Sequence, residues 1–591
     1  MEVTRIFDLL DRYAERYQKD DVLAGKKDGK WVKYSADDYI KNSNYFSYGL
    51  LGLGFKRGDK IATVANNRPE WNITDMGMMQ IGVVHVPIYP TISLVDYEHI
   101  LIHSDVKAII ISDKLLYEKL KGLIKKIPFI HHVFTIGEVE GVRNWPEIIE
   151  IGKALEAKYK DEVLKIKASI KPQELATLIY TSGTTGSSKG VMLSHRNIVS
   201  NFIATSYIQP LDHNHKVLSF LPLCHIYERM VNYKFQYKGI SIYYAESIGT
   251  IPANLKEIKA DGFNTVPRLL ERIFDKIVAK GKDLTGLKKS IFFWALNLGL
   301  RYELNGANGK IYETKLRIAD KLVYSKWREA LGGEVQIIVS GGSALQPRLA
   351  RFFWAAGMKV IEGYGLTETS PVIAVNHSVW PNIKFGTVGP LIQDVEVKIA
   401  EDGEILTKGP NLMLGYYKDP DYTNEVIDKD GWFHTGDVGI MEEGKFLKIT
   451  DRKKEIFKLS SGKYVAPQVI ENKFKESIFI EQIMVVGENE KFTSALISPN
   501  LEYLHSWATL HKIQYRDNIE LVGNKQVMAR VQKEVDKTNK ALGEHEKIKR
   551  FRLVCEEWSP KSGELSPTLK LKRSKIFKKY NHILRDIYMH G

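Results

Sequence analysis

The sequence predicts an α/β protein, and three observations support this fold class. The chain has 591 residues, and at roughly 100–200 residues per domain this length predicts several packed units. Short apolar runs recur up to residue 339, and the residue pattern then changes twice. We therefore expect a large N-terminal domain of α/β sheet subdomains with a small β-barrel-like subdomain, followed by a smaller α+β C-terminal domain.

Seven short apolar runs predict buried strands in largely parallel sheets. Segments with helical spacing or breaker residues separate many of these runs, which is typical of α/β units. The pattern does not predict the order of the strands. The runs are IATVA at 61–65, VVHVPI at 83–88, AIIIS at 108–112, LATLIY at 175–180, KVLSFL at 216–221, ISIYYA at 240–245 and VQIIV at 335–339.

The two changes in residue pattern predict the domain boundaries. Closely spaced strands and glycine turns predict a β-rich subdomain over 386–450. The second change follows DRKKEIFKLSSGKYVAP at 451–467. We place the boundary between Arg452 and Lys453, which gives an N-terminal domain at 1–452 and a C-terminal domain at 453–591. No repeat or low-complexity linker is visible, so we expect a short hinge.

Composition narrows the class of partners. The net charge of +14 favours anionic partners such as nucleotides, coenzyme A or an acidic membrane surface, although a solvated basic surface explains it equally well. Two distant cysteines, Cys224 and Cys555, exclude a disulfide or zinc framework. The N-terminus lacks the core of a signal peptide, and no apolar stretch reaches the roughly 18–20 residues of a membrane span. We expect a cytoplasmic protein that contacts membranes only at a surface, and no nucleic-acid partner.

The segment YTSGTTGSSKGVMLSH at 180–195 is the strongest candidate for a phosphate site. It follows a predicted strand, its glycines permit close backbone approach, and its amides, hydroxyls and lysine can surround a polyphosphate. The spacing does not match the Walker pattern. Taken alone, the segment is equally compatible with a flexible turn. Its candidate residues are Thr181, Ser182, Gly183, Thr184, Thr185, Gly186 and Lys189.

A second segment, VIEGYGLTETSP at 360–371, combines glycines with an aromatic and an acidic residue. Tyr364 offers a face on which a base can stack. Glu368 offers the hard oxygen that magnesium prefers beside phosphates. VSGGSALQP at 339–347 follows another buried run and is expected to line the same crevice at the strand ends. Each segment alone also fits a plain strand-to-helix turn.

Three further segments carry single charged candidates. Asp437 in DGWFHTGDVG at 430–439 is suited to hold two ribose hydroxyls, and a β-turn aspartate is the alternative. Arg452 in the segment 449–471 offers a rigid fork of donors to ribose or phosphate oxygens. Lys570 lies in the basic run LSPTLKLKRSKI at 565–576, for which a solvated tail is the alternative.

In this order, the five segments resemble the adenylate-forming superfamily of acyl-CoA synthetases, luciferases and peptide-synthetase adenylation domains. The resemblance extends from about residue 10 to 580. It implies an enzyme that activates a carboxylic acid with ATP, giving acyl-adenylate and pyrophosphate, and then transfers the acyl group to coenzyme A with release of AMP. It also implies ATP and coenzyme A as co-substrates, Mg²⁺ as cofactor, and a mobile C-terminal domain.

The resemblance implies a role for each matching position. Residues 181–189 bind the ATP phosphates, Thr184 and Glu368 meet magnesium, Lys454 matches the hinge, and Lys570 acts in adenylation with Arg452 and Glu368. Many relatives have glycine before that lysine, whereas this chain has Leu569, so Lys572 is a second candidate. The implied adenine and ribose contacts are Gly342, Ser343, Gly363, Tyr364, Gly365, Leu366, Thr367, Asp437 and Arg452.

The acid is predicted from the segment 266–330, which has apolar residues at helical spacing. This segment resembles the helical insertion of long-chain fatty-acyl-CoA synthetases. LPLCHIYER at 221–229 is similar to the same subgroup and implies that His225 lies near the acyl entrance. Ordinary core helices are the alternative. A ligase for a medium-chain or aryl acid, or an enzyme that delivers the acyl group to another acceptor, also stays open.

Rival functions differ in what they require. A peptide-synthetase adenylation domain needs a carrier domain downstream, and the sequence ends soon after Lys570. A luciferase-type oxygenase shares the motifs, and coenzyme A dependence separates it. A non-enzymatic lipid-binding protein has no need for Glu368, Asp437 and Arg452 together with Lys570. The sequence leaves monomer and homodimer open and does not identify the residues that bind coenzyme A.

Overall fold

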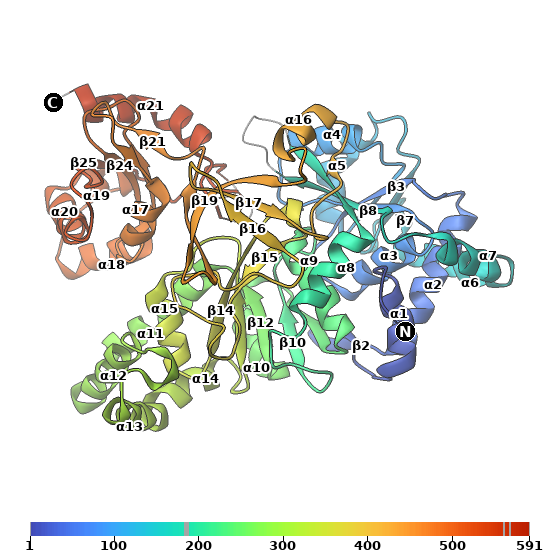
Figure 1. Ribbon diagram of the computed structural model, residues 1–591, viewed down its shortest axis with the longest axis horizontal. Helices are drawn as coiled ribbons and strands as arrows, with labels where there is room; N and C mark the ends of the chain where they lie inside the picture. Colours follow the sequence, from blue (N-terminus) through green and yellow to red (C-terminus); the bar gives the residue numbers. More distant parts are fainter. Residues whose placement is uncertain (1, 182–187, 560–561, 567–568, 590–591) are drawn as a thin grey trace. The chain divides into compact units, whose positions relative to one another are not determined.

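The computed structural model describes residues 2–181, 188–559, 562–566 and 569–589, and it divides into two compact units (Figure 1). The first unit comprises Met1–Leu270, Ile277–Val397 and Thr407–His434, and the second comprises Glu271–Lys276, Lys398–Leu406 and Thr435–Gly591. The predicted boundary between Arg452 and Lys453 stays a prediction, because a division by compactness does not locate a hinge. Among the described helices, none combines the length and apolarity that crossing a membrane requires.

The first sheet of the first unit has eight strands in the order β18-β9-β8-β4-β3-β5-β6-β7. Its outer strands are β18 (Gly415–Tyr416), β9 (Lys189–Ser194), β6 (His132–Thr135) and β7 (Arg143–Asn144). Its centre is parallel: β3 pairs with β4 and β5, and β4 pairs with β8. Four predicted apolar runs form central strands, which confirms them as buried. These strands are β3 (Lys60–Val64), β4 (Val84–Pro87), β5 (Ala108–Ile111) and β8 (Leu175–Thr181).

The second sheet of this unit has the order β15-β14-β13-β12-β10-β11-β1-β2. Its outer strands are β15 (Val372–Val375), β1 (Leu23–Lys27) and β2 (Lys30–Tyr34). The five central strands from β14 to β11 pair in parallel, and the antiparallel pairs lie at the two edges. The other three predicted runs form strands here. The parallel strands are β10 (Lys216–Ser219), β11 (Ser241–Tyr244), β12 (Gly262–Thr265), β13 (Ile337–Ser340) and β14 (Lys359–Gly365).

A fully buried polar network ties α9 (Ile226–Tyr237) to the first sheet and to α3 (Pro69–Met79). Asp75 accepts hydrogen bonds from Arg229 (2.5 Å) and from the His85 ring (2.6 Å). Arg229 also donates to Thr177 of β8 (2.7 Å), and burial lowers the pKa of His85 to about 4. Removing one partner of a buried ion pair commonly costs about 3–5 kcal/mol. The network therefore fixes α9 against the first sheet.

Helices occupy the segment 266–330, as the sequence predicts (Figure 1). The packing inside this segment is aromatic: the Tyr324 hydroxyl donates to the Ala295 carbonyl (2.7 Å), and the Phe292 and Trp327 rings meet edge to face at 5.6 Å. A bundle built this way buries one side of each helix. Its members are α11 (Pro267–Asp283), α12 (Gly286–Gly299), α13 (Lys310–Ala319), the π-helical turn η3 (Asp320–Tyr324) and α14 (Ser325–Ala330).

The second unit is α+β, as expected. Its three-stranded sheet has the order β23-β24-β25, and helices such as α17 (Pro467–Phe474), α20 (Lys525–Asn539) and α21 (Arg573–Met589) accompany it. The strands of that sheet are β23 (Ile480–Val486), β24 (Ser494–Pro499) and β25 (Arg550–Leu553). A four-stranded sheet in the order β16-β17-β19-β20 occupies the predicted β-rich segment, and it begins with β16 (Glu396–Ile399) and β17 (Glu404–Lys408). Two of its strands, β19 (Phe433–Glu442) and β20 (Phe446–Arg452), form an antiparallel pair that carries site candidates.

Candidate active site

The carboxyl ends of four parallel strands gather most of the first unit's candidates at one sheet edge. β14, β13, β12 and β10 are successive neighbours, so the segments that follow them share that edge. Tyr364 lies at the end of β14, Gly342 and Ser343 follow β13, and His225 precedes α9 after β10. The structure therefore brings the GGSALQ and GYGLTET segments together, as the sequence predicts.

A buried carboxyl group links these two segments. Glu362 in β14 is 9% exposed, and it accepts a hydrogen bond from the Leu345 amide at 2.8 Å. Burial raises the pKa of Glu362 to about 8. Sequence reasoning missed this residue, because a glutamate inside an apolar run looks like an exposed strand position.

The GYGLTET segment has a backbone that depends on glycine at one position. Gly365 opposes Val372 of β15 (Val372–Val375) across a register shift. A Cβ atom at Gly365 would lie 1.8 Å from the Pro371 carbonyl oxygen, which no side chain can tolerate. The Leu366 amide donates to the same carbonyl at 3.1 Å. The chain then turns through η4 (Thr367–Thr369), which presents Glu368 beside the half-buried Tyr364 segment.

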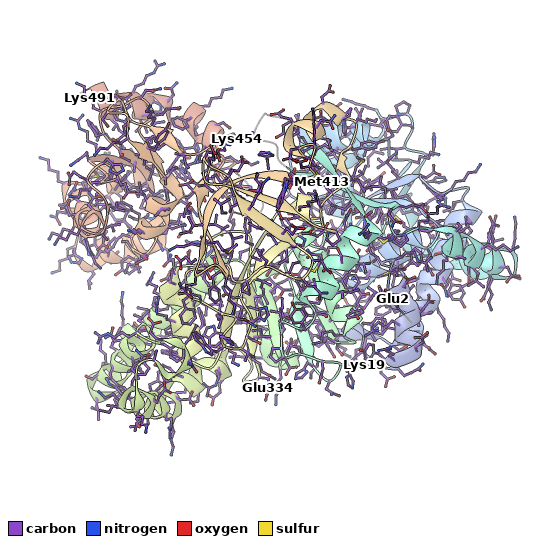
Figure 2. All side chains as sticks on the ribbon, in the orientation of Figure 1. Glu2, Lys19, Glu334, Met413, Lys454 and Lys491 are labelled. Atoms are coloured by element: carbon purple, nitrogen blue, oxygen red, sulfur yellow. The ribbon has the colours of Figure 1, made fainter. Side chains whose placement is uncertain are left out.

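Glu368 belongs to a cluster that the sequence did not reveal. The Tyr416 hydroxyl donates to the Glu368 carboxylate at 2.8 Å, and the Met413 amide (labelled in Figure 2) donates to its backbone carbonyl at 2.8 Å. Burial, with the Glu368 charge second, raises the pKa of Tyr416 above its ordinary value. The Lys189 ammonium lies 2.7 Å from the ring centre of Tyr422 and 5.4 Å from that of Tyr416. Lys189 and Glu368 thus share Tyr416 as a neighbour.

Lys189 begins β9 (Lys189–Ser194) opposite Thr181, the last residue of β8. These two residues form the mouth of the hairpin that carries the predicted phosphate loop. Ser182, Gly183, Thr184, Thr185 and Gly186 lie outside the described residues, so their predicted roles stay predictions. Tyr416 reaches the hairpin because β18 (Gly415–Tyr416) pairs with β9, with Tyr416 opposite Val191.

His225 lies where the ends of the two large sheets meet. Its ring accepts a hydrogen bond from the Tyr227 amide at 3.2 Å, and its centre is 6.4 Å from the Tyr89 ring. Asn67, which follows β3, donates to the Leu221 carbonyl at 2.6 Å. These contacts hold the end of β10 against the first sheet. Whether His225 marks an acyl entrance stays a prediction.

In the second unit, Asp437 and Arg452 are direct cross-strand partners. They oppose each other in the β19–β20 register, and Arg452 Nε lies 3.1 Å from Asp437 Oδ1. The Asp437 side chain is 5% exposed, whereas that of Arg452 is 35% exposed. The Gly436 amide is held by Glu404 at 2.9 Å. The structure thus pairs both predicted ribose ligands, with the carboxylate oriented by the guanidinium.

Lys454, labelled in Figure 2, is exposed and is the second residue after β20. Its neighbour Lys453 forms ion pairs with Asp402 (2.6 Å) and Glu404 (2.8 Å). On the other side, Glu455 forms an ion pair with Arg573 at 3.0 Å. Lys454 therefore separates two anchored residues, which is compatible with the predicted hinge and does not test it.

Lys570 is exposed and belongs to the second unit. The Ser566 hydroxyl accepts from the Lys570 amide at 3.0 Å, and the Ser566 amide donates to the Lys570 carbonyl at 2.7 Å. Leu569 has a φ of 63°, in the left-handed region that favours glycine. Leu569 therefore departs from the family pattern in its side chain, whereas its backbone keeps a conformation that favours glycine. Lys572 is half-buried.

The donor set fits a magnesium ion held jointly with phosphates. Among the described residues, no group of three or more His, Cys, Asp or Glu side chains is placed to hold a metal. Glu368 contributes a carboxylate, and Mg²⁺ typically takes one or two protein carboxylates together with waters and substrate phosphates. Thr184, the second predicted ligand, lies outside the described residues.

The fold and the grouping of these residues define an α/β enzyme with a nucleotide domain and a smaller C-terminal domain. Two family models match the chain: AMP-binding enzyme at residues 10–417, and AMP-binding enzyme C-terminal domain at residues 454–591. The chain therefore belongs to the AMP-binding enzyme family.

Curated relatives match over most of the chain. Long-chain-fatty-acid–CoA ligase FadD15 of Mycobacterium bovis is 31% identical over 567 residues, covering 95% of this chain and 93% of the relative. Long-chain-fatty-acid–CoA ligase 5 of Rattus norvegicus is 34% identical, covering 95% and 84%. Among solved structures, the adenylation domain of a carboxylate reductase from Mycobacterium chelonae has a TM-score of 0.75 at 21% identity, covering 99% and 91%. This last likeness supports the fold alone.

Proposed function

We propose that the protein is a long-chain fatty acid–CoA ligase that converts a fatty acid, ATP and coenzyme A into acyl-CoA, AMP and pyrophosphate. The observation that carries the proposal is the cluster at the mouth of the β8–β9 hairpin, where Tyr416 joins the Glu368 carboxylate to the strand that begins with Lys189. A cation and a carboxylate that both neighbour Tyr416 suit a triphosphate with its magnesium ion. Family membership and the named relatives support the same reaction.

In the first half-reaction, a carboxylate oxygen attacks the α-phosphorus of ATP. The bond between that phosphorus and the bridging oxygen breaks, and pyrophosphate leaves with the electron pair. Thr181 and Lys189 bind the phosphates, Tyr364 lies against adenine, and Asp437 and Arg452 hold the ribose hydroxyls. Lys570 stabilises the negative charge that builds between the carboxylate and the phosphate.

Magnesium would be held by Glu368 with Thr184 and the ATP phosphates, and it would neutralise phosphate charge when bound. Tyr416 orients the Glu368 carboxylate through its 2.8 Å hydrogen bond. Because Tyr416 occupies one carboxylate oxygen as a donor, the carboxylate is prevented from rotating freely.

In the second half-reaction, the coenzyme A thiol loses its proton and attacks the acyl carbonyl, and AMP leaves. We propose that the C-terminal domain turns about Lys454 between the two steps, so that Lys570 acts only in the first. Lys454→Pro locks φ near −65°. It should slow thioester formation from supplied acyl-adenylate while sparing adenylation. Equal loss of both half-reactions would contradict the hinge assignment.

The long-chain acid is proposed from the helical segment 266–330 and from the printed names of the relatives. The test is a competition assay with C14–C18 acids, a medium-chain acid, acetate, benzoate and 4-coumarate, each run with and without coenzyme A. The account expects the highest kcat/KM for the long chains and a requirement for coenzyme A. Preference for an aryl or short acid would overturn the substrate and leave the reaction class intact.

We further propose that the enzyme works in the cytoplasm and contacts an anionic membrane peripherally; the net charge of +14 supports the contact with an anionic partner. Fatty acids of this length partition into membranes, so an enzyme at the surface meets its substrate at high local concentration. Fractionation of cells into soluble and membrane pools, with and without high salt, tests this part.

A further inference from the structure

One helical segment presents apolar side chains to solvent in a regular stripe. α13, η3 and α14 run without interruption from Lys310 to Ala330. Ile311 is 77% exposed, Ile318 49% and Leu322 44%. Positions i, i+7 and i+11 lie on one face of a helix, so these three side chains share a side.

The opposite side of the same segment is packed. Ala319, Val323, Tyr324 and Trp327 are buried against the neighbouring helices of the bundle. Folding of the segment is therefore accounted for by its inner face. The exposed stripe contributes nothing to that packing, and large exposed apolar side chains in register usually mark an interaction surface.

Basic side chains surround and interrupt the stripe. Lys315 lies between Ile311 and Ile318 on the same face, and the exposed basic residues of the segment are Lys310, Lys315, Arg317, Lys321 and Lys326. The acidic residues lie elsewhere: Glu313 is half-buried, Asp320 pairs with Arg328 at 2.5 Å, and the exposed Glu329 lies beyond Lys326. The stripe and its flanks up to Lys326 are therefore apolar and cationic.

This combination favours a lipid surface over a protein partner. The buried cores of protein interfaces are depleted in lysine, because a lysine there loses its hydration without a matched partner. At a bilayer surface, a lysine can lay its methylene groups along the apolar boundary while its ammonium stays at the phosphate level. An amphipathic helix with isoleucine and leucine on one side and lysines around them is typical of helices that lie in the membrane interface.

We propose that the outer face of residues 310–326, here called the α13 stripe, docks on an anionic lipid surface. Ile311, Ile318 and Leu322 enter the boundary between head groups and acyl chains, and the lysines and Arg317 meet lipid phosphates. This inference deepens the proposed membrane contact and rests on it. Because α13 belongs to the same bundle as α12, docking would place the helical segment at the source of the fatty acid.

The apolar half of the proposal is tested by vesicle co-sedimentation of the full chain. The probes are phosphatidylcholine vesicles with and without phosphatidylglycerol. A triple serine variant should bind anionic vesicles at least about tenfold more weakly than wild type, since it removes most of the apolar insertion. The variant is Ile311→Ser, Ile318→Ser and Leu322→Ser, and its matched control is Leu115→Ser, Leu164→Ser and Ile519→Ser, three comparably exposed positions elsewhere.

The contribution of the basic side chains is tested with two charge-reversal variants that have the same net charge. One variant reverses Lys310, Lys315, Arg317 and Lys321 to glutamate, and the control reverses the exposed Lys125, Lys126, Lys160 and Lys165. The stripe variant should lose binding to anionic vesicles by about tenfold or more, whereas the control should stay within about twofold of wild type, because lipid attraction falls off within a Debye length.

The possible results separate the claims. If both stripe variants bind like wild type, the α13 stripe is not the docking face. If wild type binds neutral vesicles as well as anionic ones, the electrostatic assignment fails. If wild type binds no vesicles, both the proposed membrane contact and the docking role of the α13 stripe are wrong. The ligase proposal is tested separately, by activity with detergent-dispersed fatty acid. Because all substituted side chains are exposed, the thermal unfolding midpoints of the variants should stay close to that of wild type.

Discussion

Two lysines that are assigned to the same reaction are held in opposite ways. Lys189 starts a central hairpin strand and lies over the Tyr422 ring, with Tyr416 beside it. Lys570 has a well-anchored backbone, tied twice to Ser566, and an exposed side chain. The first lysine is placed by side-chain packing inside one unit. The second is placed by a turn that presents it outward.

This difference matches the two tasks we propose. A group that binds phosphates throughout both half-reactions profits from a constant position, since preorganised charge needs no rearrangement during the reaction. A group needed in one step only is better carried at the tip of a separate unit, where one movement brings it in or takes it away. Substitutions in the two regions test whether the lysines differ in this way.

The largest effect is expected from Lys570→Ala. Losing one donor that stabilises developing charge commonly costs about 3–4 kcal/mol, or two to three decades in rate. Pyrophosphate release in the adenylation step should fall by that amount, while thioester formation from supplied acyl-adenylate should stay near wild type. Lys572→Ala is the control and should leave both steps intact. The assignment is wrong if Lys572→Ala alone blocks adenylation.

A second effect is expected at Glu362, the buried carboxyl group that accepts a hydrogen bond from the Leu345 amide. The folded-state pKa of Glu362 is raised to about 8 from 4.5, so between these values the folded chain binds more protons than the unfolded chain. Stability from this group is therefore greatest at low pH and is lost as pH rises through about 8. Glu362→Gln keeps an acceptor for the Leu345 amide and cannot ionise.

Wild type should thus lose stability relative to Glu362→Gln between pH 5 and pH 9, by up to a few kcal/mol, at about 1.4 kcal/mol per unit of pKa shift. Thermal unfolding midpoints of the two proteins across this range measure the difference. Parallel curves would show that Glu362 ionises as freely in the folded chain as in the unfolded one.

A smaller effect is expected from Tyr416→Phe, which removes the hydrogen bond to Glu368 and keeps the ring near Lys189. A hydrogen bond to a charged group is worth about 1.5–3 kcal/mol, so kcat/KM for ATP should fall by roughly tenfold or somewhat more. The apparent affinity for Mg²⁺ should weaken with it. Tyr422→Phe also keeps its ring over Lys189 and should behave like wild type. Equal losses in both variants would contradict the orienting role of Tyr416.

The smallest effect is expected at Leu569. Glycine at this position removes the steric strain of the left-handed backbone, which costs an L-residue about 1–2 kcal/mol. Roughly half of this gain in stability is lost again, because glycine has more conformational freedom in the unfolded chain. Leu569→Gly should therefore keep adenylation within about twofold and change stability by less than about 1 kcal/mol. Leu569→Val should lower both, since β-branched residues tolerate positive φ poorly. If Leu569→Gly disrupts adenylation, the leucine side chain itself has a role.

Much of the fold was predictable because buried parallel strands are apolar along their whole length. The runs at 61–65 and 108–112 became β3 and β5 for this reason. Asp437 and Arg452 were predicted separately from turn and charge patterns, and their opposition in the β19–β20 register agrees with a shared ligand.

Tyr416 and Glu362 were not predictable in the same way. Tyr416 reaches Glu368 only because β18 pairs with β9, a contact between residues more than two hundred positions apart in the chain. No local period encodes such pairing. Glu362 looks like a surface position of a strand until the Leu345 amide is seen to turn towards it. The adjacent pair Tyr416 and Tyr417 after Gly415 was the available signal for Tyr416.

The central claim is a ligase reaction that cleaves ATP at the α-phosphorus, and the most direct test is the identity of its products. The purified full chain is incubated with palmitate, ATP, Mg²⁺ and coenzyme A, and nucleotides, pyrophosphate and thioester are separated by chromatography. The account predicts AMP, pyrophosphate and palmitoyl-CoA in equal amounts, with pyrophosphate formation requiring the acid. ADP and orthophosphate as the primary products, or ATP cleavage that does not depend on the acid, would contradict it.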